Sequence, residues 1–165
     1  MRASPSQCAV PRRACAGFTV IELVAVIVVL GIVSAIALPR LTDRSAFQAR
    51  GFEDEVLAAL RHARALAVAS GCEVQVSIAG DGYALNQQTG CDAGGFALAV
   101  PDPATQAPTY AGAAPVGITL NGPTSFVFTT LGEAAIGGAV TDVVLNVGGN
   151  ANRTITVFGQ TGFAQ

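Results

Sequence analysis

The sequence predicts an α+β protein in which a long N-terminal helix packs on an antiparallel β-sheet domain. Two observations predict this fold class. Residues 18–38 are an apolar stretch with a single charge, Glu22, and residues 43–70 contain no proline and one glycine. Beyond residue 71, short segments of alternating polar and apolar residues are separated by glycine- and proline-rich turns, as is typical of strands.

The first 38 residues predict a membrane anchor preceded by a basic leader. Residues 1–17 hold three arginines, no acid and no apolar stretch of their own, unlike a secretory signal peptide. As a helix, residues 18–38 would extend ~31 Å, enough to cross a bilayer core of ~30 Å. The positive-inside rule predicts a single-pass inner-membrane protein with its C-terminal domain in the periplasm. Cys8 and Cys15, in the leader, have no metal-ligand spacing and are interpreted as incidental.

Glu22 is unusual because a carboxylate within a membrane span costs roughly 2.5–3.5 kcal/mol at the centre and less near an end. One interpretation is that Glu22 only reaches the headgroup region. The other is that it needs a cationic partner. If the chain is cut after Gly17, the free α-amino group of Phe18 could pair with its own Glu22 or with that of a neighbouring helix.

The run Gly17-Phe18-Thr19-Val20-Ile21-Glu22, followed by an apolar helix, resembles the processing site of type IV prepilins and type II secretion pseudopilins. The resemblance implies that a prepilin peptidase cleaves between Gly17 and Phe18 and N-methylates Phe18. It also implies that Glu22 guides the docking of the chain with other pilin or pseudopilin subunits. Gly31 and Pro39 fall where pilin helices often carry a helix-loosening glycine and proline.

Residues 39–71 are predicted to continue the helix on the periplasmic side, with a bend near Pro39 or Gly51. One apolar stripe should cover the sheet, and Gly71 should close the helix. His62 has no second histidine or nearby carboxylate at ligand spacing, so neither a metal nor a catalytic role is expected. The stripe comprises Val56, Leu60, Ala63 and Ala67. The charged residues outside the stripe are interpreted as a solvated face or as intersubunit contacts. They are Glu53, Asp54, Glu55, Arg61 and Arg64.

The β-rich domain, residues 72–165, is predicted to begin with a hairpin around the tight turn 80–82. A proline-rich loop should occupy residues 101–115, a break residues 131–133, and a polar turn residues 148–152. The predicted strands are residues 73–78, 83–86, 94–100, 117–120, 125–129, 141–147 and 153–158.

Cys72 and Cys91 flank the first predicted hairpin. In the periplasm we expect them to form a disulfide, because no thiol-buffered pool keeps them reduced there. Two buried free thiols are the alternative. A redox or metal role is not expected, since no Cys-x-x-Cys pair is present.

The second half of the chain is similar to GspH/FimT-type minor pilins and pseudopilins. The similarity rests on the run from Ser125 to Gly132, on the run from Arg153 to Gly162, and on the helix segment 61–67. It implies a pilin-like fold and a structural subunit of a type IV pilus or a type II secretion system. The four predicted segments are the leader 1–17, the transmembrane helix 18–38, its continuation 39–71 and the globular domain 72–165.

Charge and composition exclude several other functions. Without residues 1–17, the chain carries six arginines against eleven acidic residues, which disfavours nucleic-acid binding. A pilin-like receptor for DNA or surfaces is therefore the less favoured alternative, since residues 65–165 hold one arginine and six acids. A third alternative is an anchored periplasmic domain that is never assembled. No catalytic, cofactor or metal-binding motif is present, so we do not expect an enzyme.

Overall fold

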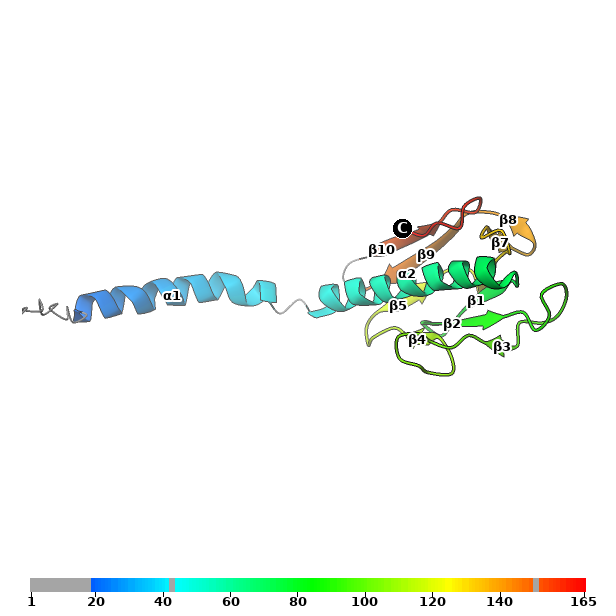
Figure 1. Ribbon diagram of the computed structural model, residues 1–165. Helices are drawn as coiled ribbons and strands as arrows, with labels where there is room; N and C mark the ends of the chain where they lie inside the picture. The colour runs from blue at the N-terminus through cyan, green and yellow to red at the C-terminus, as the bar shows by residue number, and fades with distance from the viewer. Residues whose placement is uncertain (1–18, 42–43, 150–151) are drawn as a thin grey trace, which may run out of the picture. The chain divides into compact units, whose positions relative to one another are not determined.

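The structure, a computed structural model, describes residues 19–41, 44–149 and 152–165, without the side chains of residues 36–45. It divides into two compact units, residues 1–42 and 43–165. Helix α1, Val20–Leu41, belongs to the first unit, and helix α2, Arg44–Ser70, belongs to the second with all of the described strands (Figure 1). The single long helix that was predicted is thus described as two, and Thr42 and Asp43 between them lie outside the described residues.

Helix α1 continues past the predicted end of the apolar segment and includes Pro39 and Arg40. A proline removes one backbone donor and crowds the preceding turn, and here the helix ends two residues later, at Leu41. Within the residues that the structure describes, no helix combines the length and the apolarity needed to cross a membrane. The predicted span, residues 18–38, includes Phe18 and the side chains of residues 36–38, which lie outside that description.

Helix α2 confirms the predicted apolar stripe. Its four predicted members are all buried, and Ala49, Phe52 and Ala59 extend the same face. The helix passes through Gly51 without interruption. It ends as predicted: Gly71 takes a left-handed φ of 66°, and its N–H donates to the carbonyl of Ala67 at 3.0 Å.

The described strands pair antiparallel in two sheets. In the larger sheet the order is β3-β2-β1-β6-β7-β8, and β4 also pairs with β2; the smaller sheet has the order β10-β9-β5. The strands of the larger sheet are β1 Val74–Ala79, β2 Gly82–Gln87, β3 Leu98–Ala99, β4 Ala111–Ala113, β6 Ser125–Phe128, β7 Ala134–Ile136 and β8 Ala139–Val140. Those of the smaller sheet are β5 Thr119–Asn121, β9 Val143–Gly148 and β10 Arg153–Val157.

The first hairpin and the β9-β10 hairpin confirm the predictions, whereas three other regions differ. The predicted strand 94–100 shortens to β3, and the predicted loop 101–115 contains β4. After the break at residues 131–133, the β7-β8 hairpin was not predicted. These strands are two or three residues long, too short for an alternating pattern to show in the sequence.

The core lies between α2 and both sheets, with α2 crossing them in Figure 1. Burial alternates along β1, β9 and β10, as expected for strands with one face on the core. Among the described residues the core holds no charged side chain. Its largest fully buried side chains include Phe52, Leu60, Leu85, Phe126, Phe128, Leu145 and Ile155.

Candidate functional site

The N-terminus of α1 is organised by Thr19 and Glu22. The N–H of Glu22 donates to Thr19 Oγ1 at 3.2 Å, and the N–H of Leu23 donates to the Thr19 carbonyl at 3.1 Å. Thr19 is therefore the N-cap, and Glu22 occupies the third helical position, where a carboxylate interacts favourably with the helix dipole. The Thr-x-x-Glu spacing is the sequence signal for such a cap. It adds a local role to the two interpretations of Glu22 given above.

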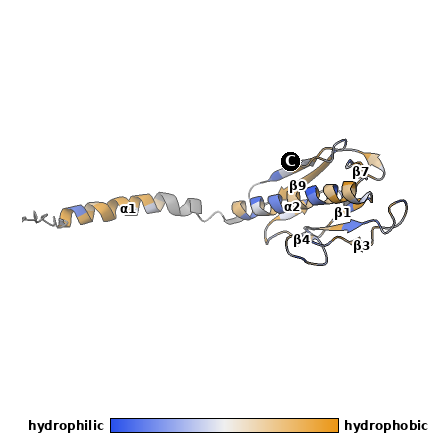
Figure 2. Ribbon diagram, in the orientation of Figure 1, coloured by the Kyte–Doolittle hydropathy of each residue, from blue (hydrophilic) through white to orange (hydrophobic). Residues whose placement is uncertain are grey.

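The described residues of α1 are apolar along most of the helix, apart from Glu22 and Ser34, and Glu22 is the one charge among those whose side chains the structure describes (Figure 2). All of its large apolar side chains from Val20 to Val33 are exposed, with exposed fractions from 43% at Val24 to 82% at Val20. A helix that is apolar all round is stable only in apolar surroundings, whether lipid or other helices. This exposed surface makes α1 the candidate assembly element.

The predicted processing residues Gly17 and Phe18 lie outside the described residues, as do Cys8 and Cys15. Gly31 and Pro39 both lie within α1, and a Cβ at Gly31 would meet nothing within 4 Å.

Cys72 and Cys91 form a disulfide, which confirms that prediction and excludes two free thiols. The bond ties the segment after α2 to the loop that follows β2.

The two halves of the C-terminal pattern meet beside α2, at a junction formed by Gly132, Gly162 and Arg64. Arg64 Nε donates to the carbonyl of Gly132 at 3.3 Å. Both glycines have positive φ, 81° and 60°, and a Cβ at Gly162 would collide with the Gly132 carbonyl. Only glycine fits so close an approach in a left-handed conformation. The sequence pattern singled out the glycine-ended runs, but nothing in it pointed to Arg64 as their common partner.

The charges outside the α2 stripe lie on a solvated face, as predicted, since all of them are exposed except Glu53, which is half-buried. Several of them also have partners within the domain. Glu53 forms an ion pair with Arg153 on β10. One guanidinium nitrogen of Arg61 donates to the carbonyl of Ala164 at 3.5 Å. Asp54 is exposed, as expected of a solvated position.

A second cluster lies on the other flank of α2, where Glu55 and His62 face two tyrosines. The hydroxyl of Tyr83 donates to Glu55 Oε1 at 2.9 Å. His62 packs edge-on against Tyr110, with ring centroids 5.3 Å apart. This edge-on contact is a packing role for His62; separately, the described residues contain no group of three potential metal ligands.

The electrostatics of this cluster are dominated by burial and by two carboxylates. Burial first, then the hydrogen bond and charge of Glu55, raises the pKa of Tyr83 above its ordinary value. Burial and the charges of Asp102 and Glu55 likewise raise the pKa of Tyr110. The hydrogen bond from Thr105 is the main cause that lowers the pKa of Asp102, and nearby His62 contributes less.

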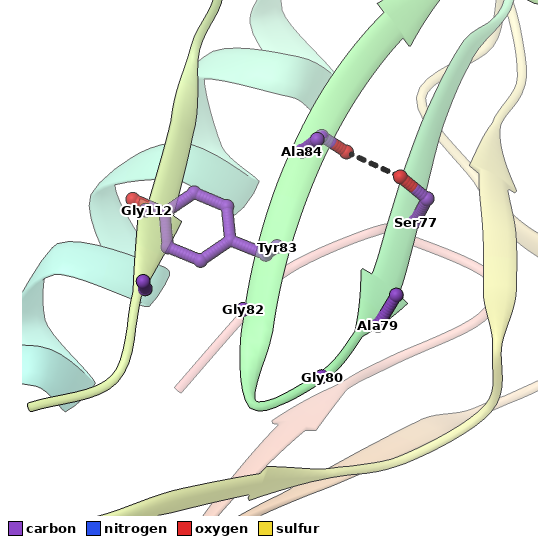
Figure 3. A pocket seen from close by; sticks show the side chains of 8 residues that line it. Ser77, Ala79, Gly80, Gly82, Tyr83, Ala84 and Gly112 are labelled. Carbon is purple, nitrogen blue, oxygen red and sulfur yellow. Dashed lines mark hydrogen bonds between the residues drawn. The ribbon is translucent and has the colours of Figure 1, made fainter. Parts of the chain in front are cut away.

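A shallow hollow of about 280 Å³ lies between β1, β2 and β4 (Figure 3). Ser77 Oγ donates to the carbonyl of Ala84 at 3.2 Å, and the Tyr83 ring reaches toward Gly112. Among the residues that line the hollow there is no histidine or carboxylate beside Ser77, the usual base for a serine nucleophile. It is lined by Ser77, Ala79, Gly80, Gly82, Tyr83, Ala84, Gly112 and Ala113.

An apolar N-terminal helix together with one helix packed on antiparallel sheets defines a pilin-like subunit. Residues 12–38 match the prokaryotic N-terminal methylation motif, and residues 54–161 match the family described as type II transport protein GspH. The second match covers more than half of the chain, so this chain belongs to the GspH family. It is a minor pilin or pseudopilin subunit, and this class is structural rather than enzymatic.

The fold is also found in a solved protein, the type IV minor pilin FimU of Pseudomonas aeruginosa strain PAO1. One crystal form is 16% identical with a TM-score of 0.53, over 74% of this chain and 87% of that one. A second crystal form is 17% identical with a TM-score of 0.50, over 68% of this chain and 86% of that one. At this identity the likeness concerns the fold alone. A comparison with curated proteins gives no match.

Proposed function

We propose that a prepilin peptidase cleaves this subunit between Gly17 and Phe18 and N-methylates Phe18, and that the subunit then assembles through α1 with other pilin or pseudopilin subunits. Residues 1–17 are the leader, 18–38 the transmembrane helix, 39–71 its periplasmic continuation and 72–165 the globular domain. The chain resides in the inner membrane as a single-pass protein with its C-terminal domain in the periplasm. It leaves the membrane by entering a pilus or pseudopilus.

The observation that carries this proposal is the exposed apolar surface of α1 with its one carboxylate at the capped end. Such a surface suits two successive environments, first lipid and then a bundle of like helices. In the bundle, the carboxylate of Glu22 can pair with the free amine of Phe18 of the same or a neighbouring subunit. The description of the family as a type II transport protein supports a type II secretion pseudopilus. The likeness to FimU supports a type IV pilus at the level of fold only.

Replacing Gly17 by alanine tests processing directly. We expect Gly17→Ala to accumulate as the uncleaved chain, because the added methyl group occupies the cleavage position. Gly31→Ala makes the same chemical change within α1 and should mature normally, since a Cβ there meets nothing. N-terminal sequencing and mass spectrometry of the membrane fraction provide the measurement. A wild-type chain that still begins at Met1 would remove the processing step.

Replacing Glu22 tests assembly separately from processing. We expect Glu22→Ala to be cleaved normally but to be lost from isolated filaments, because the pairing carboxylate is gone. Thr19→Ala removes the cap and keeps the carboxylate, so it should be incorporated nearly as well as the wild type. If Thr19→Ala is lost from filaments as completely as Glu22→Ala, the role of Glu22 is local helix capping rather than pairing.

The receptor alternative is not favoured by the placement of the basic side chains. Arg61 and Arg64 donate to backbone carbonyls, and Arg153 is paired with Glu53. These guanidinium groups already have protein partners, whereas phosphate binding needs basic groups directed at the nucleic acid.

A further inference from the structure

A cavity of about 520 Å³ lies on the acidic flank of α2, between the helix, β2 and the loop before β4. Ligand sites for organic groups have volumes of roughly 300–1,000 Å³. Its polar lining comes from three separate parts of the chain: Glu55 from α2, Tyr83 from β2, and Asp102, Thr105, Thr109 and Tyr110 from the loop.

The cavity carries two carboxylates and no basic lining residue. Both carboxylates act on both phenols, since Glu55 and Asp102 each help to raise the pKa of Tyr83 and of Tyr110. Both carboxylates therefore line one cavity and act on the same pair of phenols. The arginines Arg61 and Arg64, whose contacts are described above, are directed to the other flank of α2.

The two carboxylates are held in place but keep free acceptor sites. Glu55 Oε1 accepts from Tyr83, which leaves its second oxygen available. Asp102 accepts from the N–H of Ala104 at 2.8 Å and from Thr105 Oγ1 at 2.6 Å, one bond on each oxygen. Each carboxylate oxygen has two lone pairs, so both groups can still accept from a ligand.

Gly112 makes this arrangement possible. It pairs with Tyr83 across β2 and β4, and a Cβ there would collide with the Glu55 carboxylate and lie 2.6 Å from the Tyr83 ring. The absence of a side chain at residue 112 lets the tyrosine reach Glu55 and fix its orientation. Tyr83 is thus a positioning residue, and Tyr110 is a partly exposed aromatic wall.

The volume, charge and aromatic lining of the cavity indicate which class of ligand it can bind. A bare metal ion does not suit the site, because the described residues provide no group of three metal ligands and the space is many times that of an ion. A planar guanidinium suits it better than an ammonium. It donates to two carboxylates at once, stacks on an aromatic ring and is only weakly hydrated.

We propose that this cavity binds the guanidinium group of an arginine side chain of a protein partner, with Glu55 and Asp102 as acceptors and Tyr110 as the aromatic wall. The proposal is independent of whether residues 1–17 are removed. Its failure would leave the processing and assembly experiments untouched.

The chain provides its own probe, because it contains two tyrosines and no tryptophan, and both tyrosines line the cavity. The full chain, in a non-ionic detergent, is titrated with a terminally blocked pentapeptide that has arginine at its centre and glycine elsewhere, while tyrosine fluorescence is recorded. Matched peptides carry citrulline or lysine at the centre, and free arginine is titrated in parallel.

We expect a saturable change with the arginine peptide, which binds at least about tenfold more tightly than the citrulline peptide and more tightly than the lysine peptide. Glu55→Gln and Asp102→Asn should each weaken binding by about threefold to fivefold, the range of a partly exposed charge pair. Asp54→Asn removes the same charge from the neighbouring exposed position and should change binding by less than about twofold. Thermal unfolding of each variant checks that it folds. If Glu55→Gln does not fold, Asp102→Asn still tests the proposal, because Asp102 lies on a surface loop.

Three results would overturn the proposal. Equal binding of the arginine and citrulline peptides would show that the charge is not recognised. An effect of Asp54→Asn as large as that of Glu55→Gln would show general attraction to an acidic surface. Tighter binding of free arginine than of the arginine peptide would indicate a small-molecule ligand instead of a protein partner.

Discussion

The disulfide between Cys72 and Cys91 should supply a large share of the stability of the globular unit. The two cysteines are 19 residues apart. In the chain-entropy model, closing a loop of this length destabilises the unfolded chain by about 3.2 kcal/mol at 25 °C. The unit of residues 43–165 has about 120 residues. Dividing the lost ~3.2 kcal/mol by the average unfolding entropy of a domain of this size gives the expected shift: without the disulfide, the melting temperature should be about 12 °C lower.

The experiment compares the full chain in non-ionic detergent with the double variant Cys72→Ser/Cys91→Ser. Unfolding is followed by tyrosine fluorescence, because both tyrosines lie in the globular unit. The same substitutions at Cys8 and Cys15 are the matched control and should leave the melting temperature unchanged. A reductant should lower the melting temperature of the wild type to that of the double variant and should not affect the variant. A double variant within about 1 kcal/mol of the wild type would refute the reasoning, since the bond would then constrain the unfolded chain very little.

Two further predictions concern the glycines and the tyrosines. We expect Gly162→Ala to lower the free energy of unfolding by at least about 2 kcal/mol, because Gly162 has a φ of 60° and lies against the Gly132 carbonyl. Gly51→Ala, in the open middle of α2, should raise the free energy of unfolding by roughly 0.5–1 kcal/mol. Urea unfolding of both variants measures the two changes. The pKa of Tyr83 is raised by folding, so the stability that its protonated phenol contributes is complete below pH ~10 and is lost as the pH rises further. Urea unfolding between pH 9 and 11 should therefore show a falling stability that is less steep in Tyr83→Phe, and an identical slope in the two proteins would contradict the assignment.

The features with a strong local signal could be predicted from the sequence. The α2 stripe repeats with the period of a helix over seven buried positions, and β1 and β9 alternate over six residues. The processing motif and the glycine-ended runs identified the family without any structure. The Thr-x-x-Glu spacing of the α1 cap is also a local signal, although the cap was not among the predictions.

The remaining features depend on contacts between distant parts of the chain. Arg64 and Gly132 are 68 residues apart, and Tyr83 and Glu55 are 28 residues apart. Neither pair has a spacing that a local pattern can indicate. The same holds for β4, where Gly112 pairs with Tyr83 and leaves room for its ring.

The short outer strands of the two sheets matter for a protein that joins filaments. Strands β3 and β8 have two residues each and β5 has three, and beside β10 the main chain of Gln165 exchanges two hydrogen bonds with Thr156. Along these described outer strands, little unpaired backbone is left for another chain to extend the sheets. Such edge-to-edge extension is the usual start of amyloid-like aggregation. Subunits at high local concentration are therefore less able to associate through their β-sheets, so polymerisation can proceed through the helix.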